Sequence, residues 1–246
     1  MTQYFPGYEF YPATSTSGDR FVNIFINGHG PGTGQITFHA LRPFSLGRYD
    51  IYADAGAVDT FPAGDLVAGR LSDWASTRSA ISIGAHVLRT SWVDIDGIAR
   101  DDSAEGASGD LWDHSSGGPT RNRRLGIALT APGQSIFATY ATNSYWATFR
   151  SNLIQDGGGW YGRQGATSGA SPIAVGAAAL LLQLDPELTS ERVRRLLQET
   201  ATSDSFTGRT PNFQWGFGKI NILAAVDRLL SESGDDAVSV IRSDRN

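Results

Sequence analysis

The fold is decided by the stretch Ala166-Thr-Ser-Gly-Ala-Ser-Pro172, which runs directly into Ile173-Ala-Val-Gly-Ala-Ala-Ala-Leu-Leu-Leu-Gln-Leu184. The second part is apolar on every side, which predicts a fully buried helix. Pro172 suits the first turn of that helix, where a missing N–H costs nothing. Asp185-Pro186 ends the helix, because the residue before a proline avoids the α conformation.

Ser168 lies in the small-residue turn before this helix. Backbone N–H groups at a helix N-terminus are unpaired, and the helix dipole favours negative charge there. The position therefore suits a serine alkoxide, or the oxyanion that forms when a serine attacks a carbonyl. Serine is also a frequent N-cap, so the local alternative is that Ser168 or Ser171 caps the helix.

The residues on either side of this stretch predict an α/β region. Downstream, Thr189 is a suitable N-cap for a helix that places Val193, Leu196 and Leu197 on one face. A last short helix is expected at residues 222–230. Upstream, residues 80–85 form a buried-type strand, residues 99–124 read as loop, and residues 125–129 are apolar.

The N-terminal region has a different pattern. Residues 1–20 look irregular, and then residues 21–27, 35–41 and 48–53 alternate with a period of two between Gly/Pro turns. This predicts an antiparallel β-sandwich module, jelly-roll-like, over residues 1–70. Residues 231–246 are polar and acidic, and we expect a flexible tail.

Composition excludes several classes of protein. The chain of 246 residues has no cysteine, which excludes disulfides, a cysteine nucleophile and cysteine-based metal sites. Its net charge of −5 disfavours nucleic-acid binding. The N-terminus has no signal-peptide pattern, and the apolar run at residues 173–182 is too short to cross a bilayer, so we expect no membrane span. No cofactor or metal is expected, since Asp94, Asp96, Asp101 and Asp102 lack EF-hand spacing and read as solvated loop carboxylates.

Five segments in order resemble the subtilisin-like serine peptidases, the subtilases of peptidase family S8. These segments are Ile81-Ser-Ile-Gly-Ala85, Ser115-Ser-Gly-Gly-Pro119, Ala131-Pro-Gly133, Ala166-Thr-Ser-Gly-Ala-Ser-Pro172 and Trp215-Gly-Phe-Gly218 with Asn221. The resemblance implies that residues 71–230 are the C-terminal half of a subtilase parallel-sheet domain, into which residues 1–70 are inserted. Ala166 replaces the usual glycine of the pattern and adds a Cβ at a tight turn.

The resemblance implies serine endopeptidase activity and a role for each matched position. Ser168 would be the nucleophile, its N–H an oxyanion donor, and Thr167 a residue that shapes the turn. The floor beneath the site would be built by Ser115, Ser116, Gly117, Gly118, Pro119, Ala131, Pro132 and Gly133. The substrate would be a protein or peptide, and the location would be extracellular or in the cell envelope.

The triad partners of Ser168 are not recognisable. Subtilases place an Asp and then a His before the nucleophile, but Asn27-Gly-His-Gly30 reads as a hairpin turn and Asp54 comes after His29. Asp19 has no strand ahead of it, and no oxyanion asparagine is identifiable. The hypothesis is a chain that lacks the N-terminal half of its domain and is weak or inactive alone, with that half as a partner. The alternative is a non-catalytic pseudoprotease or partner-binding subunit.

Overall fold

The computed structural model describes residues 7–14, 20–27, 71, 74–120 and 122–233. The chain divides into two compact units, Met1–Val67 and Ala68–Asn246. In the first unit, β1 (Gly7–Thr14) pairs antiparallel with β2 (Arg20–Asn27). The strand predicted at residues 21–27 is confirmed, whereas β1 lies where we expected irregular chain. The strands predicted at residues 35–41 and 48–53 fall outside the described residues, so the β-sandwich stays a prediction.

The centre of the second unit is a parallel strand pair. β3 (Ile83–Val87) pairs with β6 (Leu129–Gln134), and the register places Ala85 opposite Ala131. The other edge of β6 is closed by residues 217–220: Thr130 N donates to Gly218 O and Ile220 N donates to Thr130 O, both at 2.8 Å. The parallel pairing of β3 with β6 is the arrangement that an α/β fold with a parallel sheet requires.

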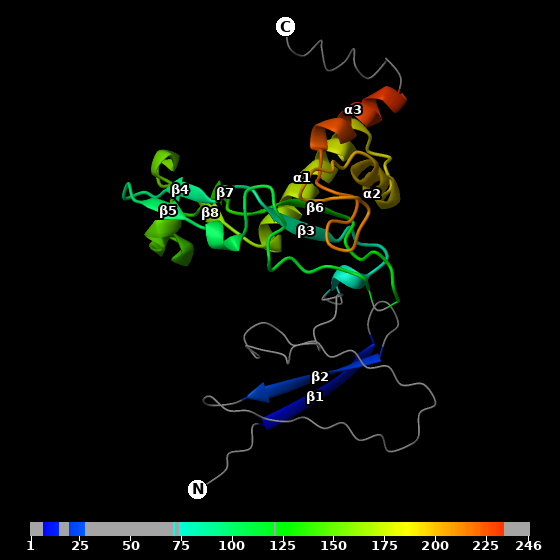
Figure 1. Cartoon of the computed structure of the whole chain (residues 1–246), viewed down its shortest axis with the longest axis horizontal. Helices are drawn as coiled ribbons and strands as arrows, with labels where there is room; N and C mark the ends of the chain where they lie inside the picture. Colours follow the sequence, from blue (N-terminus) through cyan, green and yellow to red (C-terminus); the bar gives the residue numbers. More distant parts are fainter. Residues whose placement is uncertain (1–6, 15–19, 28–70, 72–73, 121, 234–246) are drawn as a thin grey trace. The chain divides into compact units, whose positions relative to one another are not determined.

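Three helices cover this pair (Figure 1). They are α1 (Thr167–Leu184), α2 (Ser190–Glu199) and α3 (Ile222–Ser233). Their shared core consists of Leu129, Ala177, Leu181, Val193, Leu196, Leu197, Ala225 and Leu229. The predicted cap of α2 is confirmed, since Thr189 Oγ1 accepts a hydrogen bond from Arg192 N at 3.2 Å.

The prediction of a fully buried helix at α1 is wrong in two respects. The helix begins at Thr167, so Pro172 lies inside it, and only one face is buried: Gly169, Ala170, Ala174, Ala177 and Leu181. The opposite face exposes Val175, Leu180 and Leu182. The apolar composition shows that every face of the helix could be buried. The described part of the chain covers only one face. Among the described helices α1 alone has the length and hydropathy of a membrane span, but it contacts β3 and β6 as the core helix of a domain does.

A second group of strands extends from this centre (Figure 1). It consists of two antiparallel pairs, β4 (Ser91–Val93) with β5 (Ala99–Asp101), and β7 (Ile136–Thr139) with β8 (Tyr161–Gln164). Short 3-10 helices join the elements of the second unit: Trp74–Ser76, Ser103–Glu105, Tyr145–Thr148, Arg150–Asn152 and Gln155–Gly157.

Candidate active site

Ser168 is exposed in the first turn of α1. Its N–H is among the first N–H groups of the helix, which have no partner within it. The N-cap position is Ala166, and no side chain caps the helix. The alternative that Ser168 or Ser171 is the N-cap is therefore wrong, and the Ser168 hydroxyl carries no hydrogen bond to any residue in the described ranges.

Ala166 holds an unusual backbone conformation, with φ 72° and ψ 179°. Residues other than glycine rarely adopt positive φ, and such strain persists only where surrounding structure imposes it. Gly133, the next-to-last residue of β6, packs closely against this turn. A Cβ at Gly133 would lie 2.7 Å from Ala166 O and 3.1 Å from the Ala170 Cβ. The β6 backbone thus packs directly against the turn that carries Ser168.

Gln134 holds the same turn by hydrogen bonds. Its Oε1 accepts from Ala166 N at 3.2 Å, and its Nε2 donates to Asp102 Oδ2 at 3.0 Å. Asp102 also accepts from Ser135 Oγ at 2.9 Å and pairs with Arg163. The expectation of a solvated loop carboxylate is therefore wrong for Asp102. No local pattern signalled this network, because three separate segments of the chain contribute to it, at residue 102, residues 134–135 and residues 163–166.

The other predicted site residues lie close to β3 and β6. Ala131 is fully buried beside Ala85 and Ala170, and Pro132, on the same strand, is half-buried. Ser115 is buried, and its Oγ accepts from Ala85 N at 3.0 Å. Thr167 is half-buried as the first residue of α1.

The segment Ser115, Ser116, Gly117, Gly118 and Pro119 is fixed from two sides. Gly118 N donates to Phe213 O at 2.7 Å, and a Cβ at Gly118 would lie 2.0 Å from Leu125 O, so only glycine fits there. Ser116 and Pro119 are half-buried. Within the described residues, no hydrogen bond joins this segment to Ser168, and its role as a floor stays a prediction.

Neither described histidine is placed as a base for Ser168 by any hydrogen bond in the described ranges. His86 is buried on β3, with Nδ1 3.2 Å from Thr130 Oγ1. Burial, followed by the charge of Lys219, lowers the pKa of His86 from 6.5 to about 4, so it is neutral at pH 7. His114 is exposed, and its Nδ1 lies 2.5 Å from Asp113 Oδ1. His29, His39, Asp19 and Asp54 lie outside the described residues.

The described carboxylates provide little for a metal. Asp94 is completely buried, which corrects the expectation of solvation. Burial alone would raise the pKa of Asp94, but the N–H of Ile98 and the Arg100 guanidinium together lower it. In the described part of the chain, the ligand atoms of Glu105, Asp113 and His114 lie within 4.8 Å of one another. Asp113 and His114 are exposed and contact each other directly, and Glu105 accepts a hydrogen bond from Trp112 Nε1 at 2.6 Å.

Comparison with known proteins defines the protein family to which this chain belongs. The profile of the subtilase family matches residues 55–218, two thirds of the chain. The chain therefore belongs to the subtilase family, and its parallel strand pair and covering helices are part of a subtilisin-like α/β fold.

Particular relatives extend the comparison. The serine protease AprX of Bacillus subtilis (strain 168) is 30% identical over 156 residues, which are 63% of this chain and 33% of AprX. Subtilisin DY of Bacillus licheniformis is 34% identical over 99 residues, covering 40% of this chain and 28% of that protein. The structure of fervidolysin from Fervidobacterium pennivorans aligns with a TM-score of 0.42 and 25% identity over 62% of this chain and 20% of that one. The chain thus spans a third or less of the length of the curated relatives that it matches.

Proposed function

We propose that this chain contributes the nucleophile of a serine endopeptidase that acts on protein or peptide substrates. The observation that carries the proposal is the exposed Ser168 at the start of α1, with its turn held by Gly133 and Gln134. A nucleophile needs such support, because a displacement of about 1 Å from productive geometry costs a large part of the rate.

The chemistry follows from that position. The Ser168 Oγ attacks the scissile carbonyl carbon while a histidine takes its proton, and the carbonyl oxygen becomes an oxyanion. The Ser168 N–H donates to that oxyanion. The C–N bond then breaks, the histidine protonates the leaving amine, and water hydrolyses the acyl-enzyme in the reverse sequence.

We infer that the Asp and His come from polypeptide corresponding to the N-terminal part of the subtilase domain. Two observations support this inference. The chain spans about a third of AprX, and the apolar outer face of α1 is exposed. An apolar surface of this kind invites association, and the remaining part of the same domain is the occupant that the family match favours.

The experiment is covalent labelling with a fluorophosphonate probe. We expect weak or no labelling of the chain alone, and strong labelling when it is co-expressed with polypeptide encoded upstream that carries an Asp-x-Gly strand and a His-Gly-Thr helix. Ser168→Ala abolishes the labelling, and Ser171→Ala, which changes another exposed serine of the same helix, preserves it. Equal labelling of Ser168→Ala contradicts the assignment, and an upstream region without either motif contradicts the inferred partner.

The exposed face of α1 also favours a second candidate, a non-catalytic subunit that binds a partner. The same co-expression separates the two functions. A stable complex that the probe never labels supports the non-catalytic role. A complex labelled at Ser168 supports the peptidase.

A further inference from the structure

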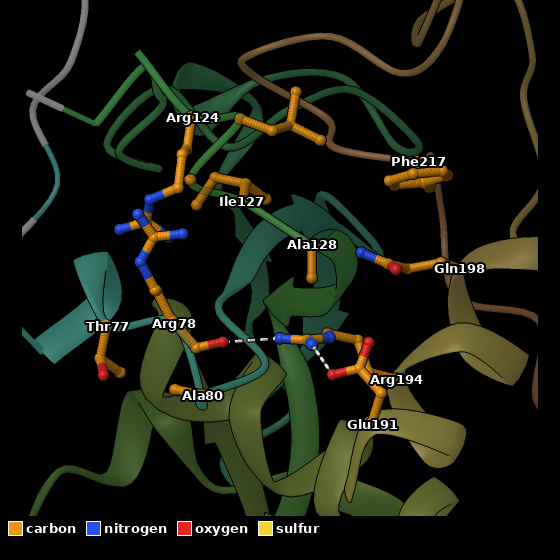
Figure 2. A pocket seen from close by; sticks show the side chains of 12 residues that line it. Thr77, Arg78, Ala80, Arg124, Ile127, Ala128, Glu191, Arg194, Gln198 and Phe217 are labelled. Atoms are coloured by element: carbon orange, nitrogen blue, oxygen red, sulfur yellow. Dashed lines mark hydrogen bonds and ion pairs between the residues drawn. The ribbon is translucent and has the colours of Figure 1, made fainter. Parts of the chain in front are cut away.

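A pocket of about 300 Å³ lies at the opposite end of β6 from the Ser168 turn. Its walls come from residues 77–80, from residues 124–128 that lead into β6, and from one face of α2 (Figure 2). A volume of this size is enough for a small ligand. The pocket takes no part in the peptidase chemistry proposed above.

The lining of the pocket carries more positive than negative charge. Three arginines, Arg78, Arg124 and Arg194, face a single acid, Glu191. Arg194 forms an ion pair with Glu191, and its Nη1 donates to Arg78 O at 2.7 Å (Figure 2). Arg194 therefore neutralises Glu191 and links the backbone of Arg78 to α2. The side chains of Arg78 and Arg124 supply the remaining positive charge of the pocket lining.

Arg78 and Arg124 extend toward one another along one wall of the pocket (Figure 2). No carboxylate in the described ranges forms an ion pair with either of them. Arg124 donates to the backbone oxygen of Ser76 and, through Nε, to Asn122 Oδ1 at 3.1 Å, and both acceptors are neutral. Burial, followed by the charge of Arg78, lowers the pKa of Arg124. Two guanidinium groups of like charge, Arg124 half-buried and Arg78 exposed, thus line one pocket in a chain whose net charge is −5.

We propose that the Arg78–Arg124 pocket binds a phosphate-type oxyanion. Each guanidinium presents a planar fork of donors that matches two oxygens of a tetrahedral anion, so one phosphate group can accept from both arginines. A phosphate with a charge of about −1.5 to −2 at neutral pH also balances two arginine charges that no described carboxylate neutralises. The bound anion would join residues 77–80 to the start of β6 and so stabilise the folded chain.

The test is thermal unfolding of the full chain in sodium phosphate and in sodium chloride at equal ionic strength. We expect saturating phosphate to raise the Tm by roughly 5 °C. This rise disappears in Arg78→Gln and Arg124→Gln. Arg209→Gln keeps the rise, because it removes the same charge from an exposed site outside the pocket, and so does Ser168→Ala. Phosphate also stabilises proteins through exclusion from their surface, and any rise that Arg78→Gln retains measures that contribution, which is subtracted from the rise in the parent chain and in Arg209→Gln.

The Tm values in chloride give a second readout. Because Arg78 and Arg124 repel each other without an anion, Arg78→Gln is expected to be at least as stable as the parent chain there. Protection by O-phosphoserine as well as inorganic phosphate identifies the phosphate group of a larger molecule as the ligand, and protection by inorganic phosphate alone identifies the free ion. An equal rise in Tm with phosphate in the parent chain and in Arg78→Gln overturns the proposal. So does a rise with sodium acetate, added as a control anion, when phosphate gives none.

Discussion

At the residue scale, the Gln134 side chain stabilises the strained backbone of Ala166. Ala166 has a positive φ, and its N–H donates a hydrogen bond to Gln134 Oε1. Gln134→Leu leaves the Ala166 N–H without its described partner and removes one donor from the Asp102 carboxylate, which keeps Ser135 and Arg163. We expect a loss of about 1–3 kcal/mol in the free energy of unfolding and faster hydrogen exchange of the Ala166 amide. Urea unfolding and amide exchange measured by NMR check this result.

Two further variants test the same explanation. Ala166→Gly relieves the positive φ, so in the Gln134→Leu background it is expected to recover part of the lost stability. Gln183→Leu changes an exposed glutamine of α1 and serves as the control. An unchanged exchange rate of the Ala166 amide in Gln134→Leu contradicts a positioning role for Gln134.

His86 makes stability depend on pH. Its pKa is about 4 in the folded chain and near 6.5 when unfolded, so the unfolded state binds more protons between these values. The contribution of neutral His86 to the free energy of unfolding is therefore fully present above pH 6.5. It is lost as the pH drops toward 4, by at most about 3 kcal/mol. Urea unfolding at pH 4.5, 5.5 and 7 measures the slope. His86→Gln should flatten it, whereas His114→Gln, at an exposed site, should not. Equal slopes in both variants contradict the assignment.

At the scale of single elements, α2 depends on its cap. Thr189→Ala removes the acceptor for Arg192 N and is expected to lower the free energy of unfolding by about 1 kcal/mol. Ser190→Ala, one residue later and exposed, is the control and should change little. Thermal unfolding of both variants checks the prediction, which fails if the two lose the same stability.

The elements also show what the sequence could predict. The cap at Thr189 and the end of α1 before Asp185 were predictable, because each depends on neighbouring residues alone. The β4–β5 hairpin was missed, since three-residue strands leave no alternation to detect and their pairing depends on the rest of the fold. The Asp102–Gln134 contact and the Arg78–Arg124 pocket could not be predicted from the sequence either, because each joins residues far apart in the chain.

At the scale of the whole molecule, the feature that bears on association is the exposed apolar face of α1. Val175, with 67% of its surface exposed, belongs to an apolar face that continues through Leu180 and Leu182. We expect the purified chain to associate with increasing concentration, and Val175→Lys to reduce that association. Leu223→Lys, at a similarly exposed site (71%) on α3, is the control. Sedimentation velocity measures both, and equal behaviour of the two variants contradicts a role for the α1 face.

The burial of α1 could not be read from its composition, because composition is the same whether one side or every side is covered. The order of the motifs did predict the family and, with it, the α/β fold, since those segments meet at β3, β6 and the start of α1.

The closure of β6 by residues 217–220 has a consequence for the order of folding. Thr130 and Gly218 are 88 positions apart, so this contact forms only after a long loop has closed. On the ribosome, β6 and α1 leave the exit tunnel well before the residues that complete their sheet. The nascent chain must therefore hold its central strand half-paired for several seconds at ordinary synthesis rates of about 5–20 residues per second. Chaperones that shield apolar segments would act during that interval, which ends once residue 220 has emerged.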